Sequence, residues 1–270
     1  MNLCVPDTLT IGNSEKYRVS IRLSSGGLSF AGCIPAEKNT FFYTETKINR
    51  TKKYGDAVKE LFFAHPFFSY TYEQIDVICA YPQFTFVPES IFEETKKEQL
   101  LSFVFSDPDK KTLYERLDEF DSVLLFAMQQ EIYEFFTRSL LRPVFSHAVT
   151  LLLTEWKKQN LTGYPKQLYV AIHNDMMVVA CLDKGVLTFI NSFPVDEPAD
   201  MIYYILYVWK QTGLDQMKDE LFLYVNPQTY QSLKETLQTY VSHIEWVQPL
   251  WPDTGREIPP DITALFQCVS

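Results

Sequence analysis

Two short polar stretches contain the residues whose types and spacing could do chemistry. Gly26-Gly27 follows a run of alternating apolar residues, and His173-Asn174-Asp175 ends a continuous apolar run. Paired glycines allow backbone N–H groups to approach the phosphates of a nucleotide, and the second stretch is a compact polar cluster at the end of a predicted strand. Gly, Asn and Asp are also the residues that tight hairpin turns favour. Simple turns are the favoured interpretation of both stretches, and these five residues are candidate cofactor-binding positions only if the protein binds a nucleotide.

The other reactive residue types form no catalytic or metal-binding pattern. The four histidines are far apart and lack the spacing of metal ligands, and His147 fits a structural position just before a helix. The five cysteines are scattered, odd in number and without a CxxC pair, which is typical of a reducing compartment. A nucleophile elbow, a P-loop and a GxGxxG motif are all missing. We predict no catalytic residue, no metal site and no bound cofactor.

Composition narrows the range of partners. The net charge is −10, and no stripe of basic residues is present, so neither nucleic acid nor an anionic membrane surface is an expected partner. The longest apolar run, at 201–209, is too short to cross a bilayer, and the first residues lack the pattern of a signal peptide. We expect a cytoplasmic protein. Its 21 Phe and 16 Tyr mostly fill a core, and some are available for a protein partner.

The hydrophobic pattern predicts three strands, a helix, a strand and a second helix in each half of the chain. In the first half we expect these elements at 17–23, 28–33, 40–48, 54–64, 75–80 and 89–103. In the second half we expect them at 168–173, 176–182, 186–193, 200–212, 221–225 and 229–240. The repeated plan indicates an internal duplication. It predicts two domains, 1–160 and 161–270, with residues 159–165 as the linker.

The segment between the two halves carries the most specific pattern. A predicted strand and helix, SVLLFAMQQEIYEFF from Ser122, are followed by Leu141-Arg142-Pro143-Val144-Phe145. This stretch resembles the actin-like pilus assembly proteins (PilM-like), in which a Leu-Arg-Pro-Val strand leads toward the second domain. The whole chain is similar to a family of uncharacterised Bacteroidetes proteins with an actin-like ATPase fold. The resemblance implies an α/β, duplicated ribonuclease-H-like (actin-like ATPase) fold, with two βββαβα-type halves and mixed central sheets.

A working actin-like ATPase would hold its nucleotide with three loops. The resemblance implies an Asp with nearby Gly in the turn after the first strand of each half. Residues 20–27 keep the glycines without the Asp, and Ala171-Ile172-His173 stands where family members tend to have Asp-Ile-Gly. We therefore predict that the second half lacks both the acid that would hold the metal ion and the glycine that would let the backbone approach the phosphates.

The stretch before the helix expected at 200–212 reads Pro194-Val195-Asp196-Glu197-Pro198, where the resemblance implies glycines. A phosphate at a helix start needs N–H donors and positive potential. Asp196 and Glu197 would repel it, while stabilising an empty helix start by about 0.3–1 kcal/mol each. Residues 223–227 also lack the glycines of an adenosine loop. Nucleotide turnover is not predicted.

A ribonuclease-H-like nuclease is a second enzymatic interpretation. It needs several carboxylates around two metal ions. Ser20 and Arg22 in the first half, and Ile172 and Asn174 in the second, occupy the corresponding strand positions. The sequence therefore argues against this activity.

Two hypotheses remain. The first is a catalytically silent actin-like module that binds another protein, with residues 251–260 available to pack across an interface. The second is a divergent nucleotide-binding protein, in which Gly26-Gly27 and His173-Asn174-Asp175 face each other across an interdomain cleft. The sequence does not predict an oligomeric state.

Overall fold

The computed structural model describes residues 3–48, 51–105, 109–159, 165–247 and 257–267. The chain divides into two compact units, the first up to Leu151 and the second from Leu152, with the C-terminal residues shared between them. The predicted domain boundary at 160 and most of the predicted linker lie outside the described residues, as do residues 251–256 of the predicted interface segment. Within the described ranges, no helix is long and apolar enough to cross a membrane.

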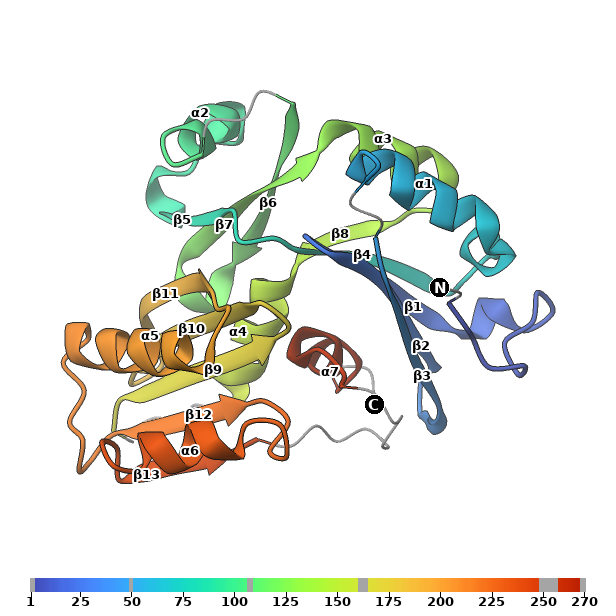
Figure 1. Cartoon of the computed structure of the whole chain (residues 1–270). Coiled ribbons are helices and arrows are strands. Elements are labelled where there is room, and N and C mark those ends of the chain that lie inside the picture. Colours follow the sequence, from blue (N-terminus) through green and yellow to red (C-terminus); the bar gives the residue numbers. More distant parts are fainter. Residues whose placement is uncertain (1–2, 49–50, 106–108, 160–164, 248–256, 268–270) are drawn as a thin grey trace. The chain divides into compact units, whose positions relative to one another are not determined.

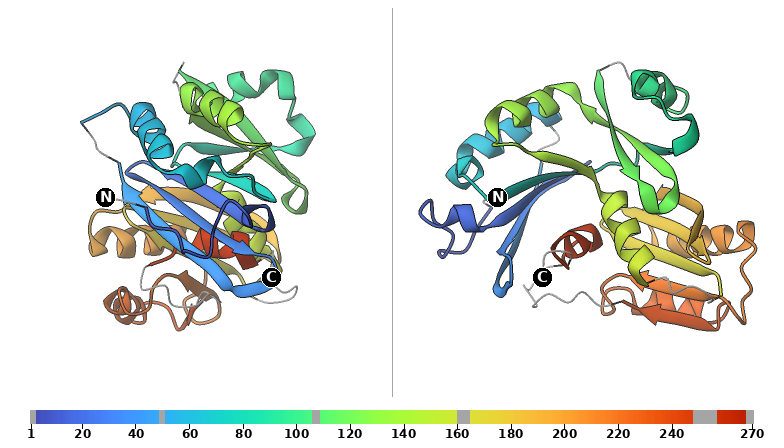
Figure 2. Two further views of the ribbon diagram at one scale, coloured as in Figure 1. Left: turned by 90° about the vertical axis from the view of Figure 1, so that its right-hand side faces the viewer. Right: turned by 180° about the vertical axis from the view of Figure 1, so that it is seen from behind.

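The first unit is built on a five-stranded mixed sheet in the order β3-β2-β1-β4-β8 (Figure 1). Its strands are β1 (Arg18–Ser24), β2 (Gly27–Ile34), β3 (Glu37–Lys47), β4 (Gln74–Ala80) and β8 (Val144–His147). The first three strands form an antiparallel meander, whereas β1, β4 and β8 are parallel. Helices α1 (Tyr54–Ala64) and α3 (Gln130–Ser139) lie side by side (Figure 2), where the ring of Phe62 meets that of Phe135 at 5.0 Å. Short 3-10 turns η1 (Ser14–Lys16) and η2 (Pro66–Ser69) complete this part.

A three-stranded antiparallel sheet is inserted between β4 and α3. It has the order β5-β7-β6, with β5 (Phe84–Pro88), β6 (Lys110–Leu117) and β7 (Ser122–Gln129). The helical turns beside it are η3 (Glu89–Ile91), η4 (Glu94–Lys96), α2 (Lys97–Ser102) and η5 (Asp118–Phe120). The long helix predicted at 89–103 is therefore wrong. Phe92 is extended and packs against Tyr114 of β6 at 5.1 Å, so a tertiary contact breaks the expected helix.

The second unit repeats the five-stranded plan, in the order β11-β10-β9-β12-β13. Its strands are β9 (Gln167–His173), β10 (Met176–Asp183), β11 (Val186–Pro194), β12 (Glu220–Tyr224) and β13 (His243–Trp246). Helices α5 (Pro198–Gln211) and α6 (Gln231–Leu237) pack on one face around Leu168, Val170 and Ile172. Trp156 of α4 (Ala148–Gln159) stacks on Tyr169, whose side chain points to the other face. The C-terminal helix is α7 (Pro260–Gln267).

The two five-stranded sheets have the same strand order. The places of β1, β2, β3, β4 and β8 in the first sheet are taken by β9, β10, β11, β12 and β13 in the second. The predicted duplicated, mixed α/β fold is confirmed. The helix of the first unit that corresponds to α6 is α3, because α3 precedes β8 as α6 precedes β13. The helix predicted at 89–103 does not have this place. The first half therefore follows the βββαβα plan only when the inserted sheet is set aside.

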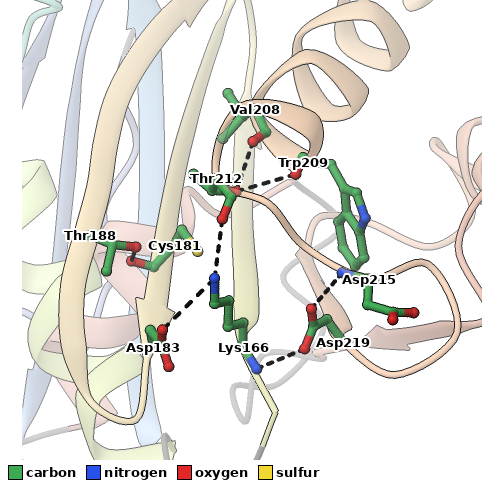
Figure 3. A network of polar contacts seen from close by, with 9 residues as sticks. All are labelled: Lys166, Cys181, Asp183, Thr188, Val208, Trp209, Thr212, Asp215 and Asp219. Atoms are coloured by element: carbon green, nitrogen blue, oxygen red, sulfur yellow. Dashed lines mark hydrogen bonds and ion pairs between the residues drawn. The ribbon is translucent and has the colours of Figure 1, made fainter.

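A polar network closes one end of the second sheet (Figure 3). The buried Asp219 carboxylate accepts hydrogen bonds from the backbone N–H groups of Lys166 at 2.9 Å and Asp215 at 2.6 Å. The Lys166 ammonium donates to the Thr212 carbonyl at 3.3 Å, just beyond the end of α5. These contacts join the start of β9 to the end of α5 and the start of β12. They lie at the opposite end of β9 from His173, so this network is structural.

Candidate functional site

The glycine pair lies in the predicted hairpin. Ser24 pairs with Gly27, which leaves Ser25 and Gly26 as the two-residue turn between β1 and β2. The positive φ expected of these glycines is not found, because the glycines with positive φ among the described residues are Gly185 and Gly213. Gly27 has a different role. A Cβ there would lie 2.8 Å from the Thr46 carbonyl oxygen, so glycine is what lets β3 approach β2.

His173, Asn174 and Asp175 form the tip of the β9–β10 hairpin in the second unit. Asn174 takes the left-handed conformation with φ 54°, which Asn tolerates better than most residues. The Asp175 carbonyl accepts a hydrogen bond from the N–H of Val195 at 2.9 Å, which fixes the chain just before α5. The His173 side chain is buried, whereas Asn174 and Asp175 are exposed. That this tip binds a cofactor together with Gly26 and Gly27 stays a prediction.

A buried polar cluster that the sequence did not reveal lies in the first unit. It gathers where the parallel strands β1, β4 and β8 end, which is the edge of an α/β sheet at which ligands usually bind. Cys79 of β4 pairs with His147 of β8, and Glu115 of β6 reaches the same place. Arg22, near the end of β1, is 9% exposed. This cluster is the candidate functional site of the first unit.

His147 is neutral and caps a helix. Its Nε2 lies 3.0 Å from the Tyr81 carbonyl oxygen, which can only accept, so this nitrogen carries the proton. The other ring nitrogen, Nδ1, accepts from the N–H of Val149 in the first turn of α4 at 3.2 Å. Burial lowers the pKa of His147 to about 4, and the positive charge of Arg22 acts in the same direction. The ring is therefore uncharged at neutral pH.

Glu115 stands at the same helix start. Its Oε2 accepts from the His147 backbone N–H at 2.7 Å and from the Thr150 hydroxyl at 2.8 Å. Burial raises the pKa of Glu115 to about 7, although these hydrogen bonds act against the rise. A carboxyl group thus occupies the positive end of α4, where an anionic ligand would otherwise be stabilised.

The start of α5 in the second unit is also occupied by a carboxylate of the chain. The Asp200 carboxylate accepts from the N–H groups of Glu197 at 3.1 Å and Asp196 at 3.3 Å. The sequence pointed to the side chains of Asp196 and Glu197 at this place. In the structure the backbone N–H groups of both residues donate to the Asp200 carboxylate, and Glu197 and Asp200 form a capping box at the start of α5.

These contacts do not fit a magnesium nucleotide, the ligand that the actin-like fold implies. Such a ligand needs open N–H groups for its phosphates and acids for its metal ion. The N–H groups at two helix starts already meet carboxyl oxygens, and Arg22 is a buried cation near the end of β1. Over the described ranges, no group of three or more His, Cys, Asp or Glu side chains could hold a metal ion. The described contacts therefore give a magnesium nucleotide no role in this protein's site.

One sequence signal could have pointed to the cluster. Arg22 is a charged residue in a strand that is buried at every position from Val19 to Leu23, and a charged residue in a buried strand is unusual. Glu115 gave no comparable signal, because its partners His147 and Thr150 are more than thirty residues away along the chain.

Known proteins resemble the chain over nearly its full length. Residues 6–244 match the family model described as "Protein of unknown function (DUF3822)". A Bacteroides thetaiotaomicron protein with an actin-like ATPase fold and unknown function is 26% identical, with a TM-score of 0.82, covering 96% of this chain and 99% of that chain. PilM of the PilM–PilN type IV pilus biogenesis complex is 11% identical, with a TM-score of 0.56, covering 94% of this chain and 98% of that chain.

No curated protein sequence matches the chain at a significant level. The predicted resemblance to uncharacterised Bacteroidetes proteins with this fold, and more distantly to PilM, is confirmed. The chain belongs to the family described as "Protein of unknown function (DUF3822)", and its fold is that of the actin-like ATPases.

Proposed function

We propose that this protein is a non-catalytic, protein-binding module built on an actin-like scaffold. One observation carries the proposal: in each unit, a helix start that could hold a phosphate is closed by a carboxyl group of the chain itself. Glu115 closes α4 in the first unit, and Asp200 closes α5 in the second. The scaffold is kept, whereas the groups that would bind a nucleotide are engaged elsewhere.

Electrostatics supports the loss of nucleotide binding. A triphosphate at either helix start would have to displace a hydrogen-bonded carboxyl group and would be repelled by it when it is ionised. The repulsion between two unit charges 4 Å apart is about 4 kcal/mol near a protein surface. The favourable effect of a helix start on an anion is about 0.3–1 kcal/mol when exposed. The repulsion is the larger of the two effects.

Exposed apolar residues at the end of α2, beside the inserted sheet, support protein binding. Phe103 and Val104, at the end of α2, are 78% and 56% exposed. Large apolar side chains with this exposure are typical of surfaces that a partner covers. PilM, which has the same fold, forms a complex with PilN. We name the segment from α2 to Val104 the α2 surface and propose it as the place where a protein partner binds.

We expect the melting temperature to stay unchanged in excess Mg-ATP or Mg-GTP. A nucleotide at 100 times its dissociation constant would add about 2.7 kcal/mol of stability, which corresponds to several degrees for a protein of this size. Differential scanning fluorimetry checks this, with Mg²⁺ alone and nucleotide alone as controls. A saturable rise in melting temperature would instead establish the divergent nucleotide-binding interpretation.

Site-specific photo-crosslinking in cells tests the protein-binding half of the proposal. A photoreactive residue at position 103 is expected to crosslink one discrete partner, and Val104→Glu should abolish the product because it places a charge in the contact. The matched control position is Phe63 on α1, which is 73% exposed and lies outside the α2 surface. A product that survives Val104→Glu, or none at either position, would contradict the proposed surface.

A further inference from the structure

The N-terminal segment, residues 3–9, is held on the first unit by side chains of other elements. It contains no helix or strand, yet Leu3 is buried. His65, which follows the last residue of α1, accepts a hydrogen bond from the Leu3 N–H at 3.0 Å. The Thr44 hydroxyl of β3 accepts one from the Cys4 N–H at 3.2 Å. The docking of this segment therefore depends on acceptor atoms that belong to side chains.

The contact between Leu3 and His65 fixes the protonation state of the imidazole. A backbone N–H can only donate, so Nε2 of His65 is the acceptor and carries no proton. The proton of the neutral ring is therefore on Nδ1. Burial lowers the pKa of His65 below its ordinary 6.5, which agrees with a ring that is uncharged while the segment is docked.

The groups around the His65 ring do not stabilise a charged imidazole. The ring centroids of Phe67 and Phe68, in η2, lie 5.3 and 6.3 Å from that of His65. The last turn of α1 contributes no charged residue, and the N-terminal segment contributes the Leu3 N–H. Among the described residues, no charged or titratable side chain contributes to the lowered pKa of His65, whose cause is burial.

Protonation of His65 would replace this hydrogen bond with a contact between two donors. A proton on Nε2 removes the lone pair that accepts from Leu3, and the new N–H points at the Leu3 N–H. Both donors would then be buried without an acceptor, which is costly in a folded protein. If the segment leaves, water can accept from both groups.

We propose that His65 is an acid-sensitive switch: protonation of Nε2 releases the N-terminal segment from the first unit. The docked state requires the neutral ring, whereas the released state leaves the ring to take a proton and to contact water. Because the docked state has the lower pKa, docking is favoured above about pH 6.5 and is lost as the pH falls below it. One proton is involved, so the release equilibrium rises at most about tenfold per pH unit.

Hydrogen exchange of single amides, followed by NMR on the full-length protein at pH 7.5 and 5.5, tests the switch. The protection factor is the intrinsic exchange rate divided by the measured rate, so the pH dependence of exchange itself is removed. In the wild type, the protection factors of the Leu3 and Cys4 amides should fall several-fold from pH 7.5 to 5.5, and at most about tenfold. Slow exchange of the β1 amides shows that each sample is folded.

His65→Gln separates titration from structure, because the Gln carbonyl oxygen accepts a hydrogen bond and does not titrate. Its Leu3 and Cys4 protection factors should be equal at the two pH values. Thr44→Val removes the acceptor of the Cys4 N–H, so this amide should be less protected at both pH values while the fall with acid remains. The matched control is His243→Gln, at an exposed position of β13, which should behave as the wild type does.

The wild-type comparison needs no variant, so it decides the proposal even if His65→Gln fails to fold. Equal protection of the Leu3 amide at pH 7.5 and 5.5 in the wild type would overturn the switch. A fall of the same size in wild type and in His65→Gln would also overturn it, because a different group would then carry the titration.

Discussion

Replacing Glu115 with Gln should make the protein gain stability, relative to the wild type, as the pH rises from about 4.5 to about 7. The pKa of Glu115 is raised from its ordinary 4.5 to about 7 by burial. Between these values the folded state holds a proton that the unfolded state has lost. The contribution of this group to stability is therefore full below its unfolded pKa and is lost as the pH rises through its folded pKa. Gln has no such loss, and the relative gain should be about 1–3 kcal/mol.

His147 should contribute to stability with the opposite dependence on pH. Its pKa is lowered from 6.5 to about 4, so the unfolded state binds the proton first as the pH falls. The stability that neutral His147 contributes is present above about 6.5 and is lost toward pH 4. In the wild type the two slopes oppose each other between about 4.5 and 6.5. His147→Gln should therefore lose stability relative to the wild type as the pH rises through this window.

Urea unfolding at fixed ionic strength, from pH 4.5 to 7.5, measures both slopes. The readout is how the difference in free energy of unfolding between variant and wild type changes with pH. The test therefore remains valid even if either substitution lowers stability at every pH. Glu98→Gln, at an exposed position of α2, is the control for the loss of a carboxyl group outside the cluster. Parallel pH profiles for wild type, Glu115→Gln and His147→Gln would show that the cluster is not buried as described.

Substituting Gly27 with Ala should lower the free energy of unfolding by about 1–3 kcal/mol, the usual effect of forcing an extra carbon into a packed site. The new Cβ would lie 2.8 Å from the Thr46 carbonyl oxygen, and the backbone cannot rotate away as a flexible side chain could. The β2–β3 pair would have to separate locally. Thermal or urea unfolding measures the loss.

Gly12→Ala is the matched control, because its new Cβ would lie at an ordinary 3.8 Å from Thr10 Oγ1. It should change stability by less than about 0.5 kcal/mol. If Gly27→Ala proves as stable as Gly12→Ala, the close approach of β3 does not explain this glycine. The phosphate-loop interpretation of Gly26-Gly27 would then regain support.

Much of the fold could be predicted from the sequence, because it is written in short-range patterns. Short apolar runs, alternating in β1 and continuous in β9, located β1 to β3 and β9 to β11. The turn at Asp183-Lys184-Gly185 lies between the strands predicted at 176–182 and 186–193, and Lys184 and Gly185 take the positive φ values of 52° and 81° that such a hairpin needs. The resemblance of the segment from Ser122 to Phe145 to PilM-like proteins indicated the fold family.

The errors came where a distant contact outweighs the local pattern. Residues 89–103 have the composition of a helix, yet Phe92 packs against Tyr114 and only Lys97–Ser102 remain α-helical. The glycine pair was correctly placed in a hairpin for an incorrect reason, because the constraint on Gly27 comes from Thr46 on another strand. A single-sequence pattern contains neither partner.

Only part of the candidate site could likewise be predicted from the sequence. From the sequence alone we predict that a nucleotide site would lack its acid and glycine after β9 and its glycines before α5. The side chains that lie at the helix starts are known from the tertiary structure. Glu115 reaches α4 from a strand of the inserted sheet, and its burial there raises its pKa. Hydrogen bonding and burial depend on which distant segments the fold brings together, and that information is absent from any short stretch of sequence.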